Sequence, residues 1–204
     1  MPRNIRAWDL FAAVNSAIFV GIAVAWALSG PRRHFGHANL TEFLGYSAII
    51  AGLAVVGRRQ MRDARGVGPV LLFTQIGILI HFAGGLVVVD GRRLYELTVL
   101  GLPFDKWVHL YNGLAGGALS NRLIGRHIAP APQGVVVFLV LMGAGAIVEL
   151  VEYGAWKLIP ENGVGGYDNN MLDMVANGVG CLAFLALRAV FAALRSRPAP
   201  EVSL

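Results

Sequence analysis

GVVVFLVLMGAGAIVELVEYGAWK, residues 134–157, is the stretch that decides the fold class. A helix needs about 20 mostly apolar residues to cross the hydrocarbon core of a bilayer, and this stretch is long enough. Its charged side chains, Glu149, Glu152 and Lys157, all lie toward its end. A helix on the surface of a soluble protein would instead carry a polar face along its whole length. The stretch therefore predicts a membrane-spanning helix.

Further apolar segments lie on both sides of this stretch, at 9–29, 40–57, 67–89, 105–121 and 171–194. Segment 105–121 is shorter and more polar, but without it the charge pattern of the loops would invert halfway along the chain. With it, most of the 17 Lys and Arg residues fall on the side of the N-terminus. We predict an all-α bundle of about six transmembrane helices with both termini cytoplasmic. Residues 1–204 would form one multi-pass domain in the inner (cytoplasmic) membrane.

The composition agrees with a lipid environment. Hydrophobic residues make up 56% of the chain and charged residues only 14%, with a mean hydropathy of +0.61, whereas soluble domains carry about 25% charged residues. The net charge of +5 comes largely from arginines in short turns, where they would meet anionic lipid headgroups. No basic stripe is interleaved with aromatic residues, so we expect membrane lipids and no nucleic acid as partners.

Ionisable residues recur near the non-cytoplasmic ends of four predicted helices. A charged group at the bilayer centre costs about 2.5–3.5 kcal/mol on insertion scales, so it persists where it is neutralised, meets water or binds a cation. Residues three or four apart share a helix face, which gives each helix one polar stripe. The candidate metal ligands are His81, Asp105, His109, Glu149, Glu152 and Asp173, and Asn112, Tyr153, Asp168 and Asn177 are the other members of the predicted polar pocket.

A set of carboxylate and imidazole ligands favours a divalent metal such as Zn, Mn or Fe. Simpler interpretations compete with it. Asp105 and Asp173 could each cap a helix N-terminus. His81 or His109 alone could be a core residue bonded to a carbonyl group. Glu152 could reach the membrane surface.

Three motifs occur in order along the second half of the chain. They are Asp105-Lys106-Trp107-Val108-His109, Glu149-Leu150-Val151-Glu152 and the run LDMVANGVG at 172–180. Together they resemble the VanZ-like membrane proteins. His81-Phe82 and Tyr153 make the chain look closer to the related YjdF-like inner-membrane proteins. The resemblance covers residues 76–187, with Glu152 where the VanZ-like pattern has glutamine. It implies a helical membrane fold and a place in the cell envelope, where VanZ itself is linked to glycopeptide resistance.

The first functional hypothesis is an envelope protein whose outer-leaflet pocket binds a metal and a lipid or isoprenoid phosphate. A proton-coupled transporter of a small molecule or lipid would use the same acidic residues as a relay. A non-catalytic subunit of a larger membrane complex would need them only to hold its helices together. The sequence leaves open which of the three applies, and whether the protein is an enzyme.

Overall fold

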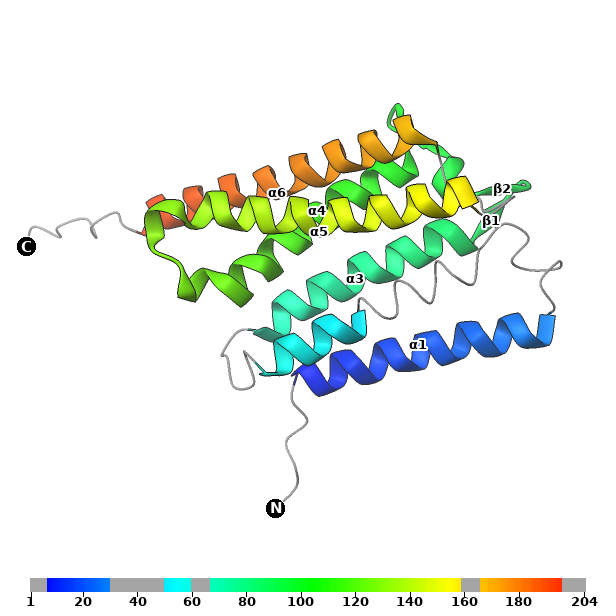
Figure 1. Cartoon of the computed structure of the whole chain (residues 1–204), viewed down its shortest axis with the longest axis horizontal. Coiled ribbons are helices and arrows are strands. Elements are labelled where there is room, and N and C mark those ends of the chain that lie inside the picture. Colours follow the sequence, from blue (N-terminus) through cyan, green and yellow to red (C-terminus); the bar gives the residue numbers. More distant parts are fainter. Residues whose placement is uncertain (1–6, 30–49, 60–66, 159–165, 196–204) are drawn as a thin grey trace, which may run out of the picture.

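The computed structural model of the chain describes residues 7–29, 50–59, 67–158 and 166–195. Helices lying side by side make up nearly all of these residues (Figure 1). Each predicted apolar segment contains a helix, so the all-α bundle is confirmed. The first part of the predicted segment 40–57 lies outside the described residues, as do both chain ends, whose predicted cytoplasmic position stays a prediction.

The helices are α1 Ala7–Ser29, an unlabelled helix at 50–59, α3 Val67–Leu86, α4 Phe104–Ile124, α5 Pro130–Leu158 and α6 Tyr167–Arg195. Two short 3₁₀ turns, η1 Leu94–Glu96 and η2 Gly125–His127, flank α4. By length and composition α3, α5 and α6 can cross a membrane, and Ala7–Gly21 of α1 is a shorter apolar helix. The more polar α4 packs against α3, α5 and α6. These neighbours cover its polar side chains.

One part of the core lies where α1, the helix at 50–59, α3 and α4 meet. Its buried residues are Trp8, Phe11, Ala54, Val67, Leu71 and Leu119. Next to it, the side-chain amides of Asn15 and Gln75 form two reciprocal hydrogen bonds: Asn15 Nδ2 donates to Gln75 Oε1 at 2.7 Å, and Gln75 Nε2 donates to Asn15 Oδ1 at 3.2 Å. This pair ties α1 to α3 inside an apolar environment.

We expect Gln75→Leu to lower the free energy of unfolding by about 1–2 kcal/mol, because the buried Asn15 amide loses both hydrogen bonds to Gln75 and keeps the one that it donates to the Phe11 backbone oxygen. Denaturation in detergent micelles, followed by tryptophan fluorescence, would measure the change. The double variant Asn15→Leu/Gln75→Leu is the control, since it removes both polar groups and should recover most of the loss. A loss of stability in the double variant equal to the sum of the losses in Asn15→Leu and Gln75→Leu would contradict this account.

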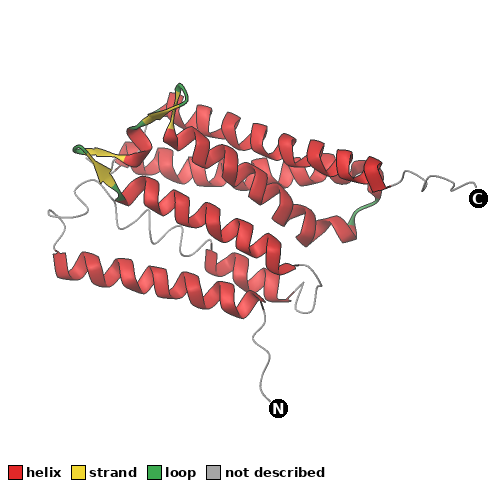
Figure 2. Ribbon diagram, turned by 180° about the vertical axis from the view of Figure 1, so that it is seen from behind, coloured by secondary structure: helices red, strands yellow, loops and turns green. Residues whose placement is uncertain are grey.

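Two β-hairpins connect α3 to α4, and Figure 2 shows them at one end of the bundle. Strand β1 Val88–Val89 pairs with β2 Arg92–Arg93, and β3 Thr98–Val99 pairs with β4 Leu102–Pro103. The turn residues Asp90-Gly91 and Leu100-Gly101 all have positive φ, as a two-residue type I′ turn requires. Between the hairpins, the Arg93 guanidinium bonds to the Glu96 carboxylate at 2.9 Å and holds its pKa below the usual value.

Helices α4 and α6 approach each other closely enough for their backbones to touch. A Cβ atom added to Gly113 of α4 would meet the carbonyl group of Asn177, and one added to Gly180 of α6 would meet the carbonyl oxygen of Leu110. Small residues permit such close packing of membrane helices. This contact fixes the position of the polar residues of α4 relative to those of α6.

Candidate metal centre

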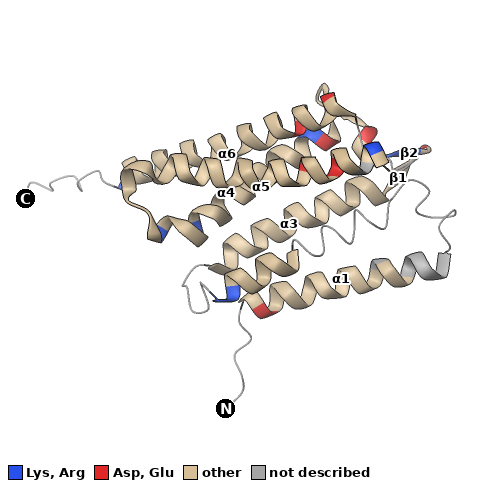
Figure 3. Cartoon of the chain, viewed as in Figure 1, with Lys and Arg blue, Asp and Glu red and all other residues tan. Residues whose placement is uncertain are grey.

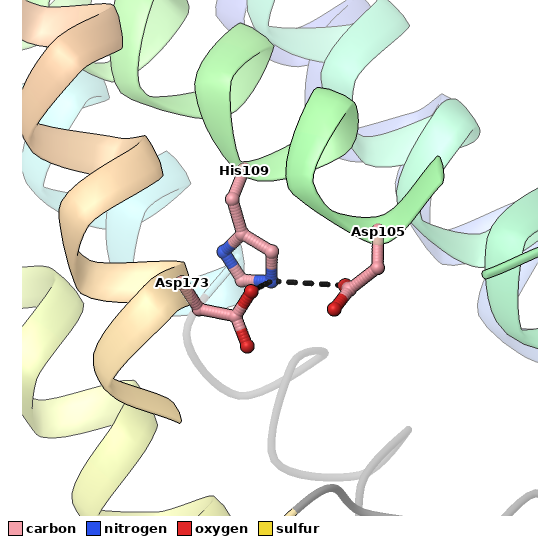
Figure 4. A group of neighbouring side chains, drawn as sticks. All are labelled: Asp105, His109 and Asp173. Carbon is pink, nitrogen blue, oxygen red and sulfur yellow. Dashed lines mark ion pairs between the residues drawn. The ribbon is translucent and has the colours of Figure 1, made fainter. Parts of the chain in front are cut away.

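The candidate centre is built around His109, which is buried on α4. Asp105 lies one turn earlier on the same helix, and its Oδ1 is 3.4 Å from His109 Nε2. Asp173 comes from α6 and is almost fully buried, with its Oδ1 3.5 Å from the same nitrogen. One ligand atom from each residue lies within 4.8 Å of the others. Figure 4 shows both carboxylates on the Nε2 side of the imidazole.

Glu149 of α5 approaches His109 from the other ring nitrogen, with its Oε1 4.0 Å from Nδ1. Its side chain is only 4% exposed, and neither carboxylate oxygen has a hydrogen-bond partner among the residues that the structure describes. Asn177 Nδ2 lies 3.3 Å from the same Nδ1 atom. Because a buried carboxylate without hydrogen bonds is costly, Glu149 is the residue of this group with the largest unmet need for a cation or a proton.

Lys106 supplies a positive charge to the same group. Its Nζ atom lies 2.8 Å from Asp105 Oδ2 and 2.5 Å from Asp173 Oδ1, and it donates to Asn169 Oδ1 at 2.7 Å. Asn169 Nδ2 in turn donates to Asp173 Oδ2 at 2.7 Å. Charged residues gather at the hairpin end of α4, α5 and α6 (Figure 3). The centre is thus a compact cluster of both signs.

A family model described as a predicted membrane protein, DUF2238, matches residues 14–193 of the chain. The chain belongs to the DUF2238 family. The match contains all the residues of the candidate centre and supports a membrane location for the protein. No curated protein and no solved structure matches the chain.

In this DUF2238 protein, two of the predicted site residues lie at or against α3: His81 and Asn112. His81 lies on α3, and the Tyr95 hydroxyl is 2.7 Å from both its Nδ1 atom and its carbonyl oxygen. If the hydroxyl donates its hydrogen to the carbonyl oxygen, it accepts a hydrogen bond from the imidazole, whose proton is then on Nδ1. Asn112 packs its Oδ1 against Gly77 of α3. It faces α3 because Gly77 leaves room there, and it is not among the side chains around His109.

The remaining predicted members lie on α5 and α6. Glu152 is half-buried, three residues after Glu149. Tyr153 packs against Trp156 and Tyr167, with ring centroids 5.7 and 6.5 Å apart, and Asp168 is exposed in the first turn of α6. Within the described parts of the chain, neither Tyr153 nor Asp168 has a hydrogen bond or ion pair to the side chains around His109. The structure therefore places these two residues outside the centre.

The helix-capping interpretations of the two aspartates are wrong. α4 begins at Phe104 with Pro103 at the cap position, so Asp105 is already inside the first turn. α6 begins at Tyr167, which places Asp173 well inside the helix. Both carboxylates instead point at His109 and Lys106.

The sequence prediction misses three polar residues of the centre: Lys106, Asn169 and Asn170. Asn170 is 1% exposed and donates its Nδ2 hydrogen to the backbone oxygen of Glu149 at 3.0 Å, which holds α6 against α5. A signal for Asn169 exists, because it precedes Asp173 by four residues and so shares its helix face. Lys106 is adjacent to Asp105, but its partners Asn169 and Asp173 are on α6. The sequence around Lys106 does not show that α6 lies next to it.

Two carboxylates and one imidazole within reach of one point fit a divalent cation. Zn, Mn and Fe accept such mixed oxygen and nitrogen ligands. Metal sites with three protein ligands keep a further position open for water or substrate. Asp105, His109 and Asp173 would hold the ion, and the buried Glu149 carboxylate lies beside the imidazole on its other edge.

Proposed function

We propose that this DUF2238 protein is a single-domain, multi-pass protein of the inner (cytoplasmic) membrane that binds a divalent metal ion at Asp105, His109 and Asp173. The observation that carries the proposal is the buried Glu149 carboxylate, which faces His109 and accepts no hydrogen bond from the described part of the chain. A dication in the cluster would offset the negative charge that Glu149 adds. The order of the three motifs supports kinship with the VanZ-like and YjdF-like proteins of the cell envelope.

For the ligand of this metal we propose a lipid or isoprenoid phosphate. Exposed apolar side chains flank the acidic residues on both helices: Leu150 and Val151 follow Glu149, and Leu172 precedes Asp173. An amphiphile in the surrounding lipid would therefore find apolar surface next to the polar centre. A bound dication would draw phosphate oxygens to the centre and polarise them as a Lewis acid.

Elemental analysis of the purified protein tests the metal site. We expect about one Zn, Mn or Fe per chain in the wild type, and a loss of most of it in His109→Ala, because an imidazole ligand is removed. Glu149→Gln should lower the metal content less. The matched control is His127→Ala, which removes an exposed histidine from η2 and should leave the metal content unchanged. Wild-type protein without stoichiometric metal would overturn the proposal.

A second candidate function is proton-coupled transport of a small molecule or lipid. The observation that favours it is again Glu149. Its buried carboxyl group, which has no hydrogen-bond partner within residues 7–29, 50–59, 67–158 and 166–195, can exchange a proton with the histidine 4.0 Å away. Proteoliposomes with an imposed pH gradient would test it. Uptake that ignores both the gradient and Glu149→Gln would exclude this function.

A further inference from the structure

The Lys106 ammonium contacts the same two carboxylates that would hold the metal. Its Nζ contacts one oxygen of Asp105 at 2.8 Å and Oδ1 of Asp173 at 2.5 Å. The Oδ1 atom of Asp173 is also the one that lies 3.5 Å from His109 Nε2. The ammonium and a metal ion would thus compete for one carboxylate oxygen.

We infer that Lys106 is an internal cation that occupies the centre in the absence of metal and must leave before metal binds. The inference rests on the proposed metal site. A cation stabilises the two carboxylates wherever water is scarce, and Lys106 supplies it from the chain itself. A dication at the same oxygens would repel the ammonium strongly at such a separation. The two cations therefore exclude each other.

The surroundings of Lys106 provide a place for the released ammonium. Its side chain is 10% exposed and that of Asp105 is 16% exposed, whereas Asp173 is 1% exposed. Asp105 is the most exposed of these side chains, so the cluster is most open next to Asp105, which adjoins Lys106 in the chain. The Asn169 backbone oxygen at 3.4 Å and the Asn169 Oδ1 atom at 2.7 Å already accept from Nζ, and both can keep the ammonium after it leaves the carboxylates. The flexible four-carbon stem of lysine allows such a displacement without movement of the helix.

Lys106→Met tests the exchange through the affinity for Mn²⁺ and Zn²⁺, measured by competition with a chelating dye in detergent. We expect the apparent dissociation constant to tighten about tenfold or more, since a competitor weakens binding in proportion to the fraction of sites it fills. Lys157→Met is the matched control. It removes an exposed lysine of α5 that stacks 4.1 Å from the Trp156 ring centroid, so it should leave the affinity unchanged.

The outcomes separate the inference from the proposed function. Wild type that binds metal while Lys106→Met binds it equally well or more weakly overturns the exchange and leaves the metal site intact. Wild type and variants that all fail to bind metal overturn both.

A second measurement uses the wild-type protein and does not depend on the folding of a variant. Acetylation of Lys106 by acetic anhydride is followed by mass spectrometry with and without saturating Mn²⁺, with Lys157 as the internal standard. Release of the ammonium should make the reaction at Lys106 severalfold faster with Mn²⁺, while that at Lys157 is unchanged. An equal or slower rate at Lys106 with bound Mn²⁺ overturns the inference.

Discussion

Asp173→Ala is expected to destabilise the metal-free protein by about 3–5 kcal/mol, the usual cost of removing one partner of a buried ion pair. Both oxygens of Asp173 are in use: Oδ1 accepts from Lys106 at 2.5 Å, and Oδ2 accepts from Asn169 at 2.7 Å. The variant would leave the ammonium paired with Asp105 alone. Denaturation in detergent micelles, followed by far-UV circular dichroism, would measure the loss.

The same helix offers a matched control for this variant. Asp168→Ala removes an exposed aspartate from the first turn of α6, where its carboxylate interacts favourably with the helix dipole. Its loss should lower the free energy of unfolding by less than about 1 kcal/mol. The double variant Lys106→Met/Asp173→Ala should be more stable than Asp173→Ala, because it also removes the ammonium that has lost one of its two carboxylate partners. Equal effects of the two aspartate substitutions would show that the pair does not stabilise the fold.

Gly180→Ala is expected to force α4 and α6 apart. The added methyl group would meet the carbonyl oxygen of Leu110 and come within 2.8 Å of the Leu114 nitrogen. Backbone atoms cannot turn aside as a side chain can, so we expect a loss of about 1–3 kcal/mol, as for other overpacked sites. Metal content should fall as well, since Asp173 moves with α6. Denaturation in micelles and elemental analysis of the same preparation would measure both effects.

Gly143→Ala is the control for this substitution. Gly143 lies within α5, and an added Cβ would meet no atom of the described residues within 4 Å. Alanine is favoured over glycine inside a helix by up to about 1 kcal/mol, so this variant should be as stable as the wild type or more stable. A Gly180→Ala variant that behaves like Gly143→Ala would mean that α4 and α6 are less closely packed than described.

The hydropathy of the sequence predicts where the helices lie better than where they begin. The predicted helix over 171–194 begins instead at Tyr167. The polar run Asp168-Asn169-Asn170 is typical of a loop, but Asn169 and Asn170 use their amides inside the bundle. Such partners come from tertiary packing, which no local pattern contains.

The two hairpins were only partly predictable. Asp90-Gly91 is a known type I′ turn sequence, so the first hairpin carries a readable signal. The second turn contains Leu100 at φ 50°. A bulky residue rarely adopts that conformation, and the sequence therefore gives no reason to expect it there.

The predicted depth of a residue in the membrane predicts the residues of the site better than helical spacing does. The predicted topology puts Asp105, His109, Glu149 and Asp173 in one layer, and the structure brings these four side chains together. Helical spacing alone was less reliable. Asn112 follows His109 by three residues, yet it faces α3, because α4 is surrounded and its polar stripe meets more than one neighbour.

The polar α4 has a consequence for how the protein is made. α4 is not among the described helices whose length and composition suffice to cross a membrane. Lys106 meets Asp173 across 67 positions of the chain, so α4 emerges from the ribosome long before its partner exists. We therefore expect α4 to remain at the membrane surface or beside the translocation machinery until α6 is synthesised, and its final insertion to follow the synthesis of α6.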